Sequence, residues 1–159
     1  MSNAVQTEAK DPAFKCVTFR LDEETYGINV LQVREVLRVC DIAPVPGAPD
    51  HVLGVINLRG SVVTVVDTRR RFRLAAKPAD EAACIIVVEV DDHVAGLFVD
   101  AVAEVLELTR SMVEAPPNVG NEENSKYIDG VVNHASGVLI LVDVSKLLND
   151  DEWKELTQP

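Results

Sequence analysis

The chain has 159 residues, of which 26 are acidic and 15 are basic, so its formal net charge at pH 7 is −11. This charge repels nucleic-acid phosphates and anionic membranes, so proteins are the expected partners, and neither nucleic-acid binding nor direct membrane insertion is expected. No apolar stretch approaches the roughly 18 residues of a membrane span, and the start of the chain lacks the apolar core of a signal peptide, so we expect a cytoplasmic protein.

The first part of the chain is predicted to be a flexible polar tail, over residues 1–12, followed by strands. Residues 14–21 alternate between apolar and polar side chains, and residues 26–30 return as a second strand after a turn. Residues 30–39 fit either a helical face or two strands, and we favour a strand, a short kink and a strand. Valine fills 27 positions, and its branched Cβ suits strands better than helices.

Further along the chain, the pattern of a strand, a turn and a strand returns three times. Residues 54–67 and 130–143 are each predicted to be two strands around a tight turn, and residues 83–99 repeat the first hairpin. Only residues 143–156 are predicted to be helical, with Asp143 as the N-cap and an apolar stripe along one face.

Two pairs of segments show that the chain is internally duplicated. Residues 26–39 align without a gap on residues 95–108 and keep the spacing V-x-x-V-x-E-V-L, and residues 54–67 align on residues 130–143. The offsets of the two alignments differ by seven residues, which places an insertion in the loop at residues 116–127. The sequence therefore predicts an all-β fold of two small barrels.

Histidines and paired aspartates are the first candidates for catalytic or metal-binding residues. His51, His93 and His134 lack the spacing of metal ligands and are interpreted as loop histidines in water. Asp67 and Asp143 occupy equivalent positions in the two copies, which could suggest a carboxylate pair, but an N-cap role fits the helix-like sequence after each of them better. We therefore expect no enzyme, no metal and no cofactor.

Cysteines and a run of arginines are the other residues that could carry chemistry. Cys16, Cys40 and Cys84 are odd in number and far apart, so they are interpreted as small buried side chains rather than a disulfide or metal site. Residues 69–71, with Arg73, concentrate positive charge in an acidic protein. This basic turn fits either a solvated turn or a contact with an acidic surface on a partner.

Glu35 and Arg59 are charges at repeated positions within otherwise apolar sequence. Arg59 has no counterpart in the second copy, where Ala135 stands. A surface ion pair between the two would stabilise the fold by only about 0–1 kcal/mol. Its value would then lie in orienting a binding surface, and a plain solvated pair is the alternative.

Residues 45–60, VPGAPDHVLGVINLRG, resemble the signature stretch of CheW-type chemotaxis coupling proteins. The similarity extends over roughly residues 14–150, through motifs at residues 26–37, 96–106 and 127–143. It implies two five-stranded SH3-like barrels with a short C-terminal helix. It also implies a scaffold that joins the cytoplasmic tips of chemoreceptors to the regulatory domain of the CheA histidine kinase, with no cofactor.

Duplication and resemblance together give domain limits and a site. The CheW-like domain would span residues 13–150, followed by a tail or helix end at 151–159. Lobe 1 would cover about residues 13–79 and lobe 2 about residues 80–150, and the two lobes could exchange strands. Members of the family bind receptors in an apolar groove between the lobes, and kinase contacts cannot be carried over residue by residue. The protein would be recruited to membrane-associated receptor arrays. By their positions in the motifs, five residues are assigned to the receptor groove: Val33, Glu35, Val36, Asn57 and Arg59.

Three residues depart from the usual pattern of the family, with Thr64 in place of Pro, Thr68 in place of Leu and Arg73 in place of Gly. The first two are expected in a strand or at its end, without effect on function, whereas Arg73 adds charge to the basic turn. Two alternative functions stay open. One is a coupling module of a CheV-like or non-flagellar chemosensory system, and the other is a small β-barrel that binds a ligand or catalyses a hydrolysis.

Overall fold

The computed structural model describes residues 11–38, 41–75, 78, 80–116, 126–135, 137–149 and 151–152. Cys40, nearly all of the predicted N-terminal tail, and most of both the insertion and the C-terminal tail lie outside these residues. Within the described part of the chain, none of the helices is long and apolar enough to cross a membrane. The strands are β1 (Ala13–Leu21), β2 (Glu24–Asn29), β3 (Val33–Arg38), β4 (Val52–Leu58), β5 (Ser61–Asp67), β6 (Cys84–Val90), β7 (His93–Val99), β8 (Ala101–Thr109), β9 (Val113–Glu114), β10 (Ile128–His134) and β11 (Gly137–Val142). The short helices are η1 (Val30–Gln32), α2 (Thr68–Arg71), η2 (Arg110–Met112) and η3 (Val144–Lys146).

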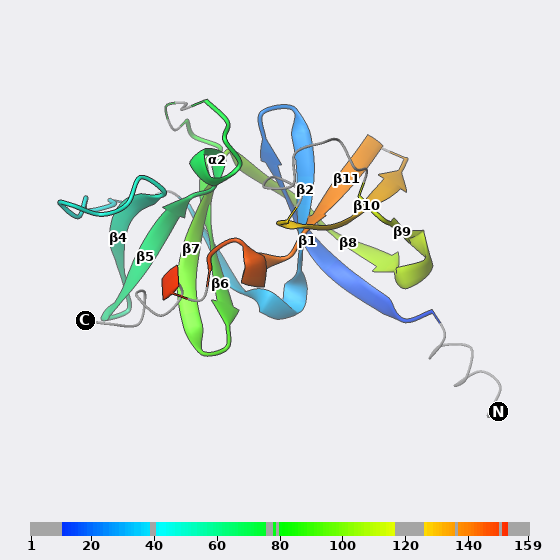
Figure 1. Ribbon diagram of the computed structural model, residues 1–159, viewed down its shortest axis with the longest axis horizontal. Helices are drawn as coiled ribbons and strands as arrows, with labels where there is room; N and C mark the ends of the chain where they lie inside the picture. The colour runs from blue at the N-terminus through cyan, green and yellow to red at the C-terminus, as the bar shows by residue number, and fades with distance from the viewer. Residues whose placement is uncertain are drawn as a thin grey trace.

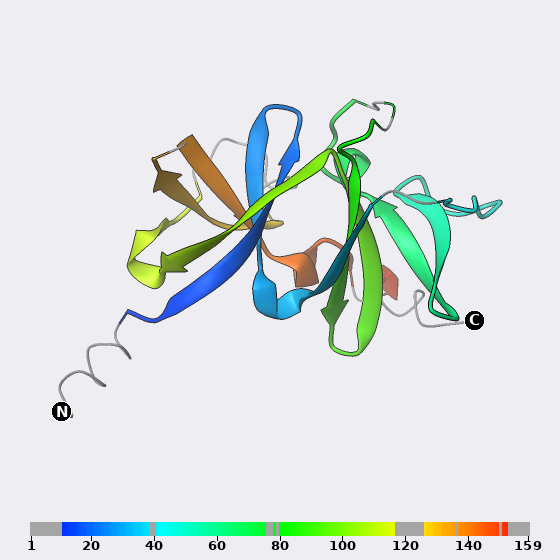
Figure 2. The same ribbon diagram turned by 180° about the vertical axis from the view of Figure 1, so that it is seen from behind.

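The strands form two sheets, as expected for an all-β fold with two related units. Sheet A has the order β8-β1-β2-β11-β10-β9, and sheet B has the order β3-β6-β7-β5-β4. Figure 1 shows sheet B on the left and sheet A on the right. Figure 2, from behind, shows β8 running from the end of β7 across to β1. The predicted all-β class with two related units is confirmed, but sheet A has six strands in place of the expected five, because it includes the two-residue strand β9.

Each sheet combines a hairpin from one copy of the duplication with strands of the other copy. The hairpin of β1 and β2 pairs with β8 and, in parallel, with β11 of the second copy. The hairpin of β6 and β7 pairs in the same way with β3 and β5 of the first copy. The copies have therefore exchanged hairpins, while the domain limits given above stay predictions.

Two glycines at equivalent positions show how closely the copies agree. Gly54 in β4 and Gly130 in β10 each follow a shift in strand register. A Cβ atom on Gly54 would lie 2.2 Å from the carbonyl oxygen of Ala43, and one on Gly130 would lie 2.9 Å from that of Glu114. Both bulges thus need glycine because a neighbouring backbone passes too close for any side chain.

The chain from β2 to β3 forms a strand, a kink and a strand, and η1 is the kink. Asn29 ends β2, and its Oδ1 accepts a hydrogen bond from the N–H of Leu31 at 2.9 Å. This cap starts the single turn of η1, after which Val33 resumes extended backbone as the first residue of β3. The kink carries the chain from β2 in sheet A to β3 in sheet B.

One apolar cluster joins the two sheets, and each sheet also has an interior of its own. Burial of this shared cluster holds the sheets together by the hydrophobic effect, which has no preferred direction. Its buried members are Phe19, Leu21, Tyr26, Ile28, Val66, Ile86, Val88, Ala95, Leu97, Val99, Tyr127, Val142, Val144, Leu147 and Leu148.

The C-terminal segment differs from the continuous helix predicted for residues 143–156. The turn η3 ends at Lys146, residues 147–149 are not helical, and residues 151–152 are helical again, while residues 150 and 153–156 lie outside the described part of the chain. The N–H of Glu152 donates to Asn149 Oδ1 and the N–H of Asn149 donates to Glu152 Oε1, both at 2.8 Å. This reciprocal cap starts a new helix and so competes with continuation of the first.

Candidate functional site

The site begins with the tight turn between β4 and β5. The two central residues, Arg59 and Gly60, have φ angles of 50° and 87°, as in a type I′ turn. Asn57 Oδ1 accepts a hydrogen bond from the N–H of Gly60 at 3.0 Å. The turn is therefore braced from within, and it fixes where the side chain of Arg59 leaves the backbone.

Arg59 forms a two-point ion pair with Glu35 of β3. Its Nη1 donates to Glu35 Oε1 at 3.3 Å, and its Nη2 donates to Glu35 Oε2. β3 and β4 are the two opposite edges of sheet B. The pair therefore bridges the edges of a sheet that curls back on itself.

The ion pair shapes the site more than it stabilises the fold. The hydrogen bond from Arg59 lowers the pKa of Glu35 below its ordinary value of 4.5, and Glu35 raises the pKa of Arg59. The side chain of Arg59 is 71% exposed and that of Glu35 is 27% exposed, so water screens their attraction. What the pair supplies is a planar fork of donors and acceptors at a defined place.

A groove lies beside the pair within sheet B, not between the lobes as the resemblance implied. Val62 from β5 and Val94 from β7 line it, with Val63 and Val87 buried beneath, and its charged lining includes Asp92. Val62 is 70% exposed. An apolar surface beside a fixed ion pair suits contact with another protein, because it offers both burial and direction.

The structure brings together some, but not all, of the predicted site residues. Glu35 and Arg59 are in contact, and Asn57 supports the turn that carries Arg59. Val33 packs against the shared core. Val36 is 41% exposed and follows Glu35 directly in β3, so it points to the opposite face of the strand. The receptor-binding role of all five residues stays a prediction.

The duplicated copy forms a similar groove in sheet A. There Val138 stands in the position of Val62, and Glu104 in that of Glu35. Val138 is also exposed, at 52%. Ala135 in place of Arg59 offers no charge to Glu104. The sequence reasoning missed the apolar lining of both grooves, although the recurrence of valine at residues 62 and 138 was a signal for it.

Two arginines of the basic turn, Arg69 and Arg71, bind other residues of this chain, so the interpretation as a solvated turn is wrong for them. Arg69 is only 5% exposed, and Arg71 donates to both carboxylate oxygens of Glu152 at 3.2 and 2.8 Å. Arg73 has a φ of 62°, a left-handed conformation that explains the glycine usual here in the family. Thr68, expected at a strand end, is instead the first residue of α2.

The equivalent aspartates act as helix caps, as predicted. Asp67 Oδ1 accepts from the N–H of Arg70 at 3.2 Å, and Asp143 Oδ1 accepts from the N–H of Ser145 at 3.1 Å. The placement of His51 in water is wrong, because its Nε2 lies 3.4 Å from Glu152 Oε2 and its side chain is 14% exposed. Among the described residues, no group of three or more histidines, cysteines or acidic residues could hold a metal ion.

Comparison with known proteins gives the family. The model of the CheW-like domain matches residues 15–152, which include both sheets. The chain belongs to the CheW family. The chemotaxis protein CheW of Treponema pallidum is 33% identical over 156 residues, which is 96% of this chain and 92% of that protein.

Other CheW relatives and a solved structure agree with this family. The chemotaxis protein CheW of Klebsiella aerogenes is 34% identical, over 84% of this chain and 81% of that protein. The crystal structure of the scaffolding protein TtCheW from Thermoanaerobacter tengcongensis matches with a TM-score of 0.76 and 33% identity. That match covers 82% of this chain and 88% of the other. The CheW fold, inferred first from sequence, is thus shared with this solved scaffolding protein.

Proposed function

We propose that this CheW protein is a non-enzymatic adaptor in the cytoplasm. It couples the cytoplasmic tips of chemoreceptors to the regulatory domain of the CheA histidine kinase and is recruited to membrane-associated arrays. The observation that carries the proposal is the match of the CheW-like domain across both sheets. The relatives are named as chemotaxis proteins and the solved neighbour as a scaffolding protein, which supports a role in assembly rather than in catalysis.

The groove beside Glu35 and Arg59 supports the assignment of the receptor contact to sheet B. Val62 and Val94, the valines of the groove that are not buried, would cover apolar surface of a receptor helix, and the ion pair would fix the orientation of that helix. Reversal of one charge, in Glu35→Arg or Arg59→Glu, would leave two like charges facing each other across the edges of the sheet. Both variants should therefore bind receptor more weakly while keeping the fold, because the pair itself contributes little to stability.

Co-elution of the purified chain with a CheA regulatory domain and with a receptor tip fragment tests the proposal. We expect complexes with both, and failure to bind either partner would refute the adaptor function. The double variant Glu35→Arg with Arg59→Glu restores opposite charges and should recover part of the receptor binding that each single variant loses.

The ion pair of Arg70 with Asp50 provides a matched control. Arg70 Nη2 lies 3.2 Å from Asp50 Oδ2, and the side chains of Arg70 and Asp50 are 55% and 85% exposed. Neither residue lines the groove. Arg70→Glu should leave receptor binding unchanged, and an equal loss in this control would show that general charge, not the groove, controls binding.

A further inference from the structure

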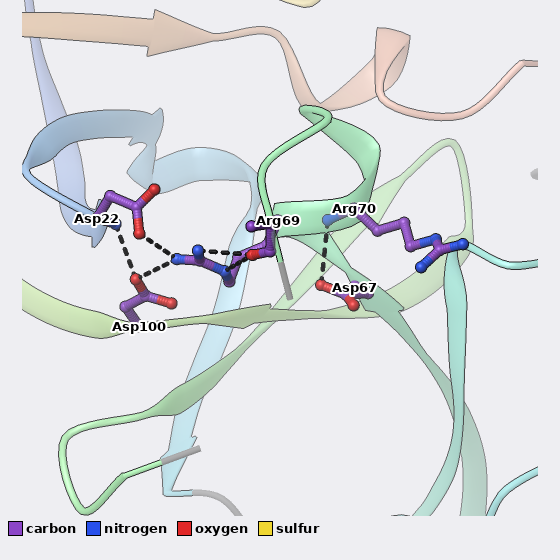
Figure 3. A network of polar contacts seen from close by, with 6 residues as sticks. Asp22, Asp67, Arg69, Arg70 and Asp100 are labelled. Carbon is purple, nitrogen blue, oxygen red and sulfur yellow. Dashed lines mark hydrogen bonds and ion pairs between the residues drawn. The ribbon is translucent and has the colours of Figure 1, made fainter. Parts of the chain in front are cut away.

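A charge cluster around the buried Arg69 connects elements of both sheets (Figure 3). Asp22 lies in the turn between β1 and β2 of sheet A. Asp100 lies between β7 of sheet B and β8 of sheet A, and Arg69 lies in α2, directly after β5 of sheet B. The guanidinium group of Arg69 points between the two carboxylates, whereas the neighbouring Arg70 extends away from them.

Arg69 makes directional bonds to three separate parts of the chain. Its Nη1 donates to Asp22 Oδ1 and to Asp100 Oδ2, both at 2.7 Å. Its Nε and Nη2 donate to the carbonyl oxygen of Ala75 at 2.9 and 2.7 Å. Asp100 Oδ2 also accepts from the N–H of Asp22 at 2.8 Å. Burial opposes the charge of Arg69, but the two aspartates outweigh burial and keep its pKa raised.

The duplication shows that a hairpin of this kind does not need the cluster in order to form. In the second copy, Asp91 corresponds to Asp22 and Ser145 to Arg69, while Leu31 of the first copy corresponds to Asp100. Asp91 has a φ of 49°, close to the 56° of Asp22, so the hairpin turn is built in the same way. Leu31 is 89% exposed, and neither counterpart, Leu31 or Ser145, is a charged residue.

We propose that Arg69 is a positioning residue that fixes the angle between sheet A and sheet B. Hydrophobic burial of the shared core holds the sheets together, but the burial itself has no preferred direction. A rigid guanidinium fork bound to fixed carboxylates does specify direction. If the chain is the adaptor proposed above, this angle sets how it presents one partner to the other.

Residual dipolar couplings of backbone N–H groups test the angle directly, because they report the orientation of each sheet in one alignment frame. In the unaltered chain, the strands of both sheets should fit one alignment tensor. In Arg69→Met, each sheet should keep its own internal couplings while the tensors of the two sheets diverge. Arg69→Lys keeps the charge but loses the fork, and it should show a smaller divergence of the same kind.

Arg70→Met is the matched control and should keep a single tensor. If Arg69→Met is too unstable for the measurement, Asp22→Asn removes one charged contact and should rotate the sheets in the direction seen for Arg69→Lys. An unchanged angle in Arg69→Lys and Asp22→Asn would overturn the proposal and leave Arg69 as a stabilising residue only.

A functional measurement separates this inference from the proposed function. Arg69→Lys should bind receptor and kinase singly as well as the unaltered chain does, but it should lose receptor-dependent control of the kinase. Full control together with a changed angle would refute the link between the angle and signalling. If the unaltered chain bound neither partner, the adaptor function would fail, while the dipolar couplings would still decide the role of Arg69.

Discussion

Two buried threonines should respond in opposite directions to the same substitution. Thr18 and Thr68 are each only 1% exposed. Thr18 Oγ1 donates to the carbonyl oxygen of Glu104 at 2.7 Å and accepts from its N–H at 3.0 Å. The hydroxyl of Thr68 has no hydrogen-bond partner among the described residues. Replacement by valine keeps the shape of the side chain and removes only the hydroxyl, so it isolates this difference.

The sizes of the two effects follow from the partners. A buried hydroxyl without a hydrogen bond costs about 1–3 kcal/mol in protein mutational data, so Thr68→Val should raise the free energy of unfolding by about 1–2 kcal/mol. Thr18→Val leaves the backbone of Glu104 without partners on an edge strand, and it should lower the free energy of unfolding by about 1–3 kcal/mol. At about 2–4 °C per kcal/mol for a chain of this size, the variants should melt about 2–8 °C above and about 2–12 °C below the unaltered protein.

Urea unfolding followed by circular dichroism, together with thermal melts, measures both variants. The m-values should stay the same, because neither change alters the surface exposed on unfolding. The reasoning is refuted if Thr68→Val destabilises the chain, or if both variants move in the same direction by similar amounts. Such a result would mean that the hydroxyl of Thr68 is satisfied in solution.

Three further outcomes test individual contacts. Arg59→Met should raise the pKa of Glu35 toward 4.5, as measured by the NMR shift of its carboxyl carbon. The pKa of Glu35 is lower in the folded chain than in the unfolded chain. Any stability from the pair is therefore present above pH 4.5 and is lost as the pH falls through the folded-state pKa. Gly54→Ala should destabilise the chain in urea unfolding, since its Cβ would lie 2.2 Å from the oxygen of Ala43, and unchanged stability would mean that the strands can separate. Cys16, whose pKa is raised by burial to about 11, should react far more slowly with iodoacetamide at pH 8 than the same cysteine in the unfolded chain, and equal rates by mass spectrometry would contradict its burial.

The fold was predictable where local pattern and repetition carried the information. Alternation located the strands, and the duplication showed that two similar units exist. The kink within residues 30–39 was harder to predict, because Val30, Val33 and Leu37 also fit a helical face. The pairing of β1 with β8 was not predictable, because alternation shows that a strand is buried but does not identify its partner.

The candidate site was only partly predictable. Glu35 and Arg59 stood out as charges in apolar sequence, and their contact followed from the resemblance. The role of Arg69 could not be read from the sequence, because a run of arginines is normally exposed and its partners Asp22 and Asp100 lie 47 and 31 residues away. The break after η3 was missed for a local reason, since the cap by Asn149 competes with an otherwise helical pattern.

The exchange of hairpins also sets the order in which the chain can be completed as it leaves the ribosome. Sheet B is built from the continuous stretch of β3 to β7 and can close once residue 99 has emerged. The hairpin of β1 and β2 is made first, yet its outer partners β8 and β11 are made only afterwards. β1 therefore keeps an open edge until β8 is made, and β2 keeps one until β11, the last strand, is made. These edges are where a nascent chain would pair wrongly with a neighbour.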